Sequence, residues 1–376
     1  MSWAIWVTGP PGSGKTVIAQ RAADLLHARG ASVRVLELDA IRTGLVPQPE
    51  YSEAEREVVY RALGYMAARL TEAAVPVIVD ATAHRRRWRD LARAAIKRFA
   101  EVQLLCPVDV CRERERTRAA GHAPPGIYAR AGRPGATVPG VDLPYEPALA
   151  PELAVDTTRD DVVATAAAAV AALAERLAAG APGGRESGRG WAIWITGRPG
   201  SGKTTLARRV AEVLAASHVP LEVLDLASAR RAVVGHEWAT DAQEAFVHRT
   251  LALTTQLLTE AGVAVILDAT APRRSWREIA REWIAHFAEV QLVCPPEICA
   301  ERERAVRWHL GAARSVDAGQ AMPDIALDYE ESLHPDLRLH THVADPRTSV
   351  EEVLRLARRL EQAVTPRSIE KERTIT

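Results

Sequence analysis

Short apolar runs alternate along the chain with longer mixed stretches. The apolar run at residues 4–8 is typical of a buried parallel strand. Residues 32–38, 75–79 and 102–106 are predicted to form the next three strands. The stretches between them, beginning with residues 16–29, are predicted helices. Strands that alternate with helices predict an α/β domain built on a parallel sheet. Ligands of such domains bind at the carboxyl ends of the strands.

The whole pattern occurs twice. The segment WAIWVTGPPGSGKT from Trp3 recurs as WAIWITGRPGSGKT from Trp191, at an offset of 188 residues. VPVIVDATAHRRRWR and FAEVQLLCPVDVCRERER recur at the same offset. A register this long indicates two whole domains and not a solenoid of short repeats. The register breaks after Arg116 and resumes at Tyr145, which matches Tyr329, so the second copy is four residues shorter in between.

The duplication predicts the domain limits. We expect a first domain over residues 1–179, a flexible linker over 180–190, a second domain over 191–365 and a polar tail over 366–376. The linker reads GAPGGRESGRG, and a Gly-rich polar composition is typical of flexible connections. Each domain is expected to be a parallel sheet flanked by helices.

Composition narrows the class of protein. The 48 Lys and Arg residues balance 48 Asp and Glu residues, so the chain lacks the cationic surplus of a nucleic-acid or membrane-surface protein. The N-terminus has no signal-peptide pattern, and residues 162–179 are too weakly apolar to span a bilayer. We therefore expect a cytoplasmic protein with no nucleic-acid or membrane partner.

Each half carries a phosphate-binding loop of the form G-x-x-x-x-G-K-[ST]. Its glycines let backbone N–H groups converge on phosphate oxygens, and the next helix directs its positive end at the same anion. The lysine reaches the β- and γ-phosphates, and the hydroxyl after it holds Mg²⁺. Two of the chain's four lysines occupy these loops. We therefore predict ATP and Mg²⁺ as cofactors, bound by Gly9, Gly12, Ser13, Gly14, Lys15 and Thr16 in the first half and by Gly197, Gly200, Ser201, Gly202, Lys203 and Thr204 in the second.

Two further motifs follow the third strand of each half. Asp80 and Asp268 each end a run of four apolar residues, where a carboxylate can hold a Mg²⁺-bound water. The alternative is a cap for the following helix. The predicted metal-binding residues are therefore Thr16, Asp80, Thr204 and Asp268. The arginines within 85–89 and 273–277 either contact phosphates or form a solvated helix face.

The acceptor side of the first half resembles the adenylylsulfate kinases (APS kinases). These P-loop enzymes phosphorylate the 3′-hydroxyl of adenosine 5′-phosphosulfate. The similarity covers most of residues 3–157 and is carried by LELDAIR from Leu36, YSEAER from Tyr51, GIY from Gly126 and PGVDLPYE from Pro139. The last of these segments is the most specific.

The resemblance implies roles for first-half residues. Asp39 would orient or deprotonate the acceptor hydroxyl, and Arg114 would lie near the nucleotide base. Guanidinium groups would bind the phosphosulfate, and residues 116–145 would form a mobile lid that excludes water. With the loop lysines, the predicted catalytic residues are Lys15, Asp39 and Lys203. The predicted substrate-binding residues are Asp39, Arg42, Arg56, Gly140, Asp142 and Tyr145.

The second half keeps the nucleotide side and changes the acceptor side. Asp39 corresponds to Ala227 and Arg56 to Glu244, whereas Arg42 corresponds to Arg230. We expect this half to bind ATP with an altered or lost acceptor site. The halves could form an intramolecular pseudo-dimer, or the chain a homodimer.

These observations favour an ATP-dependent small-molecule kinase acting on the 3′-hydroxyl of adenosine 5′-phosphosulfate. One alternative is a kinase for another hydroxyl acceptor, such as a nucleoside, sugar or antibiotic. Another is a nucleotide-binding regulatory pseudo-dimer. A GTPase is not favoured, because its guanine-reading N-K-x-D motif needs Asn, and the chain has none.

Overall fold

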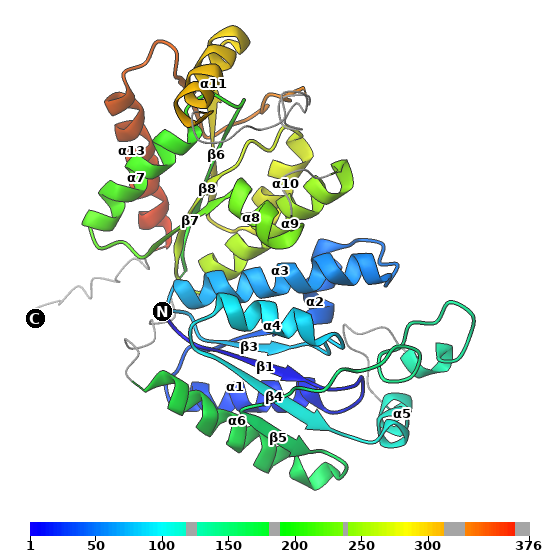
Figure 1. Cartoon of the computed structure of the whole chain (residues 1–376). Helices are drawn as coiled ribbons and strands as arrows, with labels where there is room; N and C mark the ends of the chain where they lie inside the picture. Colours follow the sequence, from blue (N-terminus) through cyan, green and yellow to red (C-terminus); the bar gives the residue numbers. More distant parts are fainter. Residues whose placement is uncertain (118–125, 180–188, 236–239, 312–327, 365–376) are drawn as a thin grey trace, which may run out of the picture. The chain divides into compact units, whose positions relative to one another are not determined.

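The computed structural model of the chain describes residues 1–117, 126–179, 189–235, 240–311 and 328–364. The chain divides into two compact units, Met1–Glu186 with Ala227–Thr254 and Ser187–Leu226 with Thr255–Thr376. Each half of the duplication contributes one parallel sheet (Figure 1). Most of the predicted linker and the whole predicted tail lie outside the described residues. The domain limits therefore stay predictions.

The first sheet has five parallel strands in the order β2-β3-β1-β4-β5. Its strands are β1 (Ala4–Thr8), β2 (Arg34–Glu37), β3 (Val77–Asp80), β4 (Phe99–Leu105) and β5 (Leu153–Asp156). Its helices are α1 (Lys15–Ala28), α2 (Leu38–Leu45), α3 (Glu53–Glu72), α4 (Arg86–Ala95), α5 (Val108–Thr117) and α6 (Val163–Ala178), with short 3₁₀ turns η1 (Ile127–Arg130) and η2 (Asp160–Val162).

Alternating side chains of β1 fill both faces of this sheet. Ile5 and Val7 are fully buried in a core with α1 and α6, which Figure 1 shows on one side of the sheet while α3 and α4 cover the other. The alanines of α6, such as Ala167 and Ala171, let it approach α1 closely. Between these residues Trp6 is fully buried, and its indole N–H donates to the Ala81 carbonyl at 3.2 Å. Burying a side chain such as Ile5 or Val7 contributes roughly 1.5–3 kcal/mol.

The second sheet repeats the order as β7-β8-β6-β9-β10. Its strands are β6 (Ala192–Gly197), β7 (Leu221–Asp225), β8 (Ala264–Asp268), β9 (Phe287–Val293) and β10 (Leu337–His340). Helices α7 (Lys203–Ala216) and α13 (Pro346–Val364) share a core with this sheet. The other helices of this half are α8 (Leu226–Val233), α9 (Asp241–Glu260), α10 (Arg274–Trp283) and α11 (Pro296–Gly311).

The four strands predicted in the first half are confirmed, with ends shifted by up to three residues. The pattern did not predict the fifth strand, β5, or its counterpart β10. In β5, Leu153 and Val155 are half-buried and the residues between and after them are exposed. It forms the edge of the sheet, so it lacks the continuous apolar run of a central strand.

Candidate functional site

The first phosphate loop joins the central strand β1 to α1. Its backbone requires glycine at two positions: Gly12 has φ 78°, and Gly14 caps α1 with φ 93°. A Cβ on Gly12 would lie 2.5 Å from the carbonyl oxygen of Cys111 in α5. The loop is therefore packed closely against α5.

Lys15, Thr16 and Asp80 meet beside this loop. The Lys15 ammonium is buried and donates to the Pro10 carbonyl at 3.0 Å. Burial lowers the pKa of Lys15, against the attraction of Asp80 and Asp39. Burial likewise raises the pKa of Asp80, against the Lys15 charge and a hydrogen bond from Thr16. The strand-end aspartate thus lies next to the loop lysine and the hydroxyl that follows it.

A cavity of about 490 Å³ opens at this edge of the sheet. The loop, β3, α2, α3 and α5 all contribute to its lining because their functional residues lie at or beyond the carboxyl ends of parallel strands. The predicted site residues that line it are Gly12, Gly14, Lys15, Thr16, Asp39, Arg42, Arg56, Asp80 and Arg114.

Arg42 of α2 is buried at the wall of the cavity. One terminal nitrogen donates to Oε1 of Glu55 at 2.5 Å, and the guanidinium carbon lies 4.9 Å from the centre of the Tyr51 ring. Its Nε–H is buried and has no hydrogen-bond partner among the described residues. A buried donor without a partner costs roughly 1–3 kcal/mol, and a bound anion would remove that cost.

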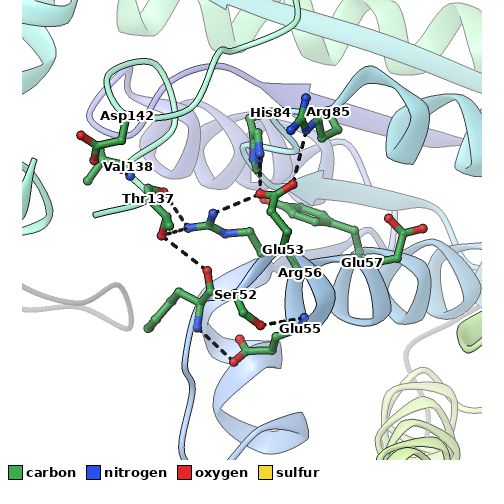
Figure 2. Close-up of polar contacts among 12 residues, drawn as sticks. Ser52, Glu53, Glu55, Arg56, Glu57, His84, Arg85, Thr137, Val138 and Asp142 are labelled. Atoms are coloured by element: carbon green, nitrogen blue, oxygen red, sulfur yellow. Dashed lines mark hydrogen bonds and ion pairs between the residues drawn. The ribbon is translucent and has the colours of Figure 1, made fainter. Parts of the chain in front are cut away.

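Arg56, near the start of α3, is bonded to a loop that lines the same cavity. Figure 2 shows its Nη2 donating to the Thr137 carbonyl at 2.8 Å and to the Thr137 hydroxyl at 3.0 Å. Nη1 lies 3.4 Å from Glu53, which also contacts Nε2 of the buried His84 at 3.1 Å. Arg56 therefore joins α3 to the segment before Pro139.

Five predicted residues of the first half do not line the cavity. Gly9 and Ser13 lie within the phosphate loop, and Gly140, Asp142 and Tyr145 support the segment that follows Thr137. Asp142 accepts the backbone N–H groups of Gly132 and Val138, both at 2.8 Å. The Tyr145 hydroxyl lies 2.9 Å from that of Thr8. The substrate-binding roles of Gly140, Asp142 and Tyr145, and the mobility of the lid, stay predictions; residues 118–125 lie outside the described chain.

Arg114 lines the cavity from α5. Its Nε donates to Asp160 at 2.9 Å, and a terminal nitrogen donates to the Thr158 carbonyl at 3.3 Å. The second-half counterpart Arg302 donates to the Thr341 carbonyl at 2.9 Å. Arg114 thus joins α5 to the segment after β5, and Arg302 joins α11 to the segment after β10.

Two arginines that follow β3 and β8 neither lie on a solvated helix face nor are free to contact phosphates. Arg89 is fully buried, and its Nε donates to Glu101 at 2.5 Å. Its Nη2 donates to the Glu146 carbonyl at 2.6 Å. Arg277 and Glu289 repeat the pair at 2.8 Å in the second half. The expectation of phosphate contact or a solvated face is wrong for these two arginines, because each one neutralises a buried glutamate.

Several cavity residues were not predicted from the sequence. They share no motif and reach the cavity from different elements: Glu37, Glu50, Tyr60, Glu115, Arg130 and Thr137. The register could have indicated one of them, because Glu37 is the direct neighbour of Asp80 across β2 and β3. The remaining ones depend on how loops fold back over the sheet.

The second half repeats the nucleotide side of this geometry. Lys203 donates to the carbonyls of Gly197 and Arg198, both at 3.0 Å. Burial raises the pKa of Asp268, against a hydrogen bond from Thr204 and the Lys203 charge. A Cβ on Gly200 would lie 2.2 Å from the carbonyl oxygen of Cys299, as Gly12 would meet Cys111.

A five-stranded parallel sheet with a phosphate loop after its central strand defines a P-loop kinase-like domain, and the chain contains two. The sequence profile of the adenylylsulphate kinase family matches residues 1–156 and again residues 189–340. The chain therefore belongs to the adenylylsulphate kinase family, as a tandem duplication. It is a phosphotransferase with an alcohol group as acceptor, in a family that uses ATP.

Two curated relatives agree with this assignment. A protein named "Probable adenylyl-sulfate kinase" from Archaeoglobus fulgidus is 37% identical over 164 residues, covering 43% of this chain and 99% of the relative. The adenylyl-sulfate kinase of Rippkaea orientalis is 37% identical over 151 residues, covering 40% and 78%. Among solved structures, that of the Mycobacterium tuberculosis APS kinase in complex with AMPPNP and APS is 26% identical, with a TM-score of 0.38 over 46% of this chain and 99% of that one. Among the described helices, none has the length and apolarity needed to cross a membrane.

Proposed function

We propose that the first half transfers the γ-phosphoryl group of ATP to the 3′-hydroxyl of adenosine 5′-phosphosulfate. One observation supports this most directly. A single cavity is lined both by the nucleotide set, Lys15, Thr16 and Asp80, and by the acceptor set, Asp39, Arg42 and Arg56. Phosphoryl transfer needs the two substrates in line within one water-excluding site.

On the donor side, the loop N–H groups and Lys15 bind the ATP phosphates. The oxygen donors of Thr16 and Asp80 fit Mg²⁺, a hard cation that is held by one or two protein oxygens together with phosphates and waters. Thr16 would bind it directly and Asp80 through water. When bound, the ion neutralises charge on the phosphates. The hydrogen bond between Thr16 and Asp80 already holds these oxygens together.

On the acceptor side, Asp39 lies in the first turn of α2 and lines the cavity. Its carboxylate orients the acceptor hydroxyl and accepts the hydroxyl proton as that oxygen bonds to phosphorus and the bond to the ADP oxygen breaks. The unpartnered Nε–H of Arg42 is a buried charged donor suited to a phosphosulfate oxygen. Arg56 keeps the Thr137 segment over the reacting groups.

The test is ADP release with Mg-ATP, with and without adenosine 5′-phosphosulfate, in the parent, Lys15→Ala and Asp39→Asn. We expect strong acceptor dependence in the parent and a loss of about 100-fold or more in each variant. Unfolding curves of the variants control for folding. ADP release that does not depend on this acceptor would refute the substrate assignment.

A second acceptor class is supported by a separate observation. The carboxylates of Glu37 and Glu50 line the same cavity as Asp39. Carboxylates accept hydrogen bonds from hydroxyl groups and disfavour anions, which suits a neutral polyol or sugar acceptor. A panel of neutral hydroxyl compounds in the same assay separates the two classes: strong ADP release with a neutral compound and none with adenosine 5′-phosphosulfate would favour the second class.

A further inference from the structure

Among the described residues, four arginines line the cavity of the first half, and one of them differs from the others. The four are Arg42, Arg56, Arg114 and Arg130. The first three each contact a carboxylate, on Glu55 at 2.5 Å, on Glu53 at 3.4 Å and on Asp160 at 2.9 Å. The Arg130 guanidinium forms no hydrogen bond or ion pair with any residue of the described chain. Its charge can therefore interact with a ligand in the cavity.

The turn that carries Arg130 is held on both sides. Arg130 is the last residue of η1, and the Tyr128 hydroxyl in that turn donates to the Pro11 carbonyl of the phosphate loop at 2.8 Å. After the turn, the Gly132 N–H donates to the Asp142 carboxylate, also at 2.8 Å. An anion that binds Arg130 would therefore order little more than its side chain, which lowers the entropic cost of binding.

Arg130 lies on the same side of the cavity as Arg42 and Tyr51. The Arg42 guanidinium carbon is 4.9 Å from the centre of the Tyr51 ring. Burial raises the pKa of the Tyr51 hydroxyl, and the positive charges of Arg42 and Arg130 both oppose that rise. Because Coulomb attraction falls off with distance, both guanidinium groups lie near this hydroxyl. The acceptor side thus offers the buried Nε–H of Arg42, which has no partner in the described chain, and the charge of Arg130.

We propose that Arg130 and Arg42 together bind the anionic group of the acceptor, and that Arg130 makes the site prefer a phosphosulfate to a neutral hydroxyl compound. The assignment rests on the proposed function, because it concerns the acceptor of that reaction. Guanidinium groups bind such anions through charge-assisted hydrogen bonds. Arg56 takes a different part, since its Nη2 already donates to the carbonyl and the hydroxyl of Thr137. Arg56 is thus a positioning residue for the segment that contains Thr137.

The charge of Arg130 favours one of the two acceptor classes. The carboxylates of Glu37 and Glu50 line the same cavity and disfavour an anion. A neutral polyol or sugar would make no use of the Arg130 charge, whereas a phosphosulfate would pair with it and so offset the repulsion from these carboxylates. Replacing Arg130 should therefore weaken the binding of an anionic acceptor and leave the binding of a neutral compound unchanged.

Initial-rate kinetics of the full chain test this role in Arg130→Gln, with Arg133→Gln as the matched control. Arg133 is exposed, follows Arg130 by three residues and does not line the cavity. Arg130→Gln should raise the KM for adenosine 5′-phosphosulfate about 10–100-fold, as expected for the loss of a hydrogen bond to a charged group, and change the KM for ATP by less than about threefold. Arg133→Gln should change neither KM by more than about threefold. Arg130→Lys, which keeps the charge without the planar fork, should recover part of the loss.

The anchor of the turn provides a second test. Tyr128→Phe removes the hydrogen bond to Pro11 and should raise the KM for adenosine 5′-phosphosulfate about 2–10-fold, because a hydrogen bond between neutral groups is worth less than one to a charge. In the double variant with Arg130→Gln, the Tyr128 substitution should have no further effect on this KM, since it acts through the placement of Arg130. Fully additive effects would refute that placement.

The outcomes separate the role of Arg130 from the proposed function. Equal KM values for adenosine 5′-phosphosulfate in Arg130→Gln and Arg133→Gln would overturn the assignment of Arg130 while the proposed function stands. A parent without ADP release that depends on this acceptor would overturn the proposed function, and the role of Arg130 with it. Urea unfolding curves of all variants control for folding, and Arg130→Met serves if Arg130→Gln fails to fold.

Discussion

Replacing Arg89 with Met should destabilise the first half strongly. Arg89 is fully buried and donates from Nε to Glu101 at 2.5 Å and from Nη2 to the Glu146 carbonyl at 2.6 Å. Methionine keeps much of the side-chain volume but leaves the Glu101 carboxylate buried with a weaker partner. Removing one member of a buried pair costs about 3–5 kcal/mol. Arg93, at 3.7 Å from Glu101, offsets part of this, so we expect about 3 kcal/mol.

The assay is urea unfolding followed by circular dichroism, with calorimetry to separate the transitions of the two halves. A loss of about 3 kcal/mol corresponds to a fall of about 6–12 °C in the melting temperature of a domain of this size. Arg277→Met is the matched control, because it breaks the Arg277–Glu289 pair and should lower the other transition.

A double variant distinguishes charge from packing. Arg89→Met with Glu101→Leu removes both charges and should recover most of the lost stability, because hydrophobic replacement of a buried pair is often neutral. A loss below about 1 kcal/mol for Arg89→Met, or a double variant as unstable as the single one, would show that the ion pair does not carry the stability assigned to it.

Three further outcomes are expected. Gly12→Ala should abolish nucleotide binding by the first half in calorimetric titration, because its Cβ would lie 2.5 Å from the Cys111 carbonyl oxygen; unchanged affinity would contradict this. Burial lowers the pKa of His84 from 6.5 to about 4, against the attraction of Glu53. The unfolded chain therefore binds this proton at a higher pH than the folded chain does. The stability that His84 contributes is complete above pH 6.5 and is lost as the pH falls from 6.5 towards 4. Urea unfolding should show about 2 kcal/mol lost between pH 7 and 5, and a flatter slope in His84→Gln. Asp39→Glu should lower kcat more than it changes the KM for ATP, since Asp39 is proposed to contact the acceptor; a purely ATP-side effect in initial-rate kinetics would count against that role.

Much of the nucleotide side could be predicted from the sequence because it depends on local geometry. The phosphate loop needs glycines and a lysine at set intervals, so its spacing alone predicts Lys15 beside the N-terminus of a helix. The continuously apolar central strands are equally visible, since both their faces are buried. Asp80 follows from the same pattern, because the ends of neighbouring parallel strands meet at one edge. The duplication extends all of these predictions to the second half.

The tertiary structure alone decided which charged residues neutralise each other. Arg89 and the neighbouring arginines look alike in sequence, and its burial against Glu101 depends on a strand that begins ten residues later. The unused donor of Arg42 likewise follows from where Glu55 points. A charge has no periodicity that shows its partner, because Coulomb attraction acts between groups that only the folded chain brings together. The sequence by itself therefore determined the class of domain and its phosphate loops, and the packing decided which arginines remain available to an acceptor.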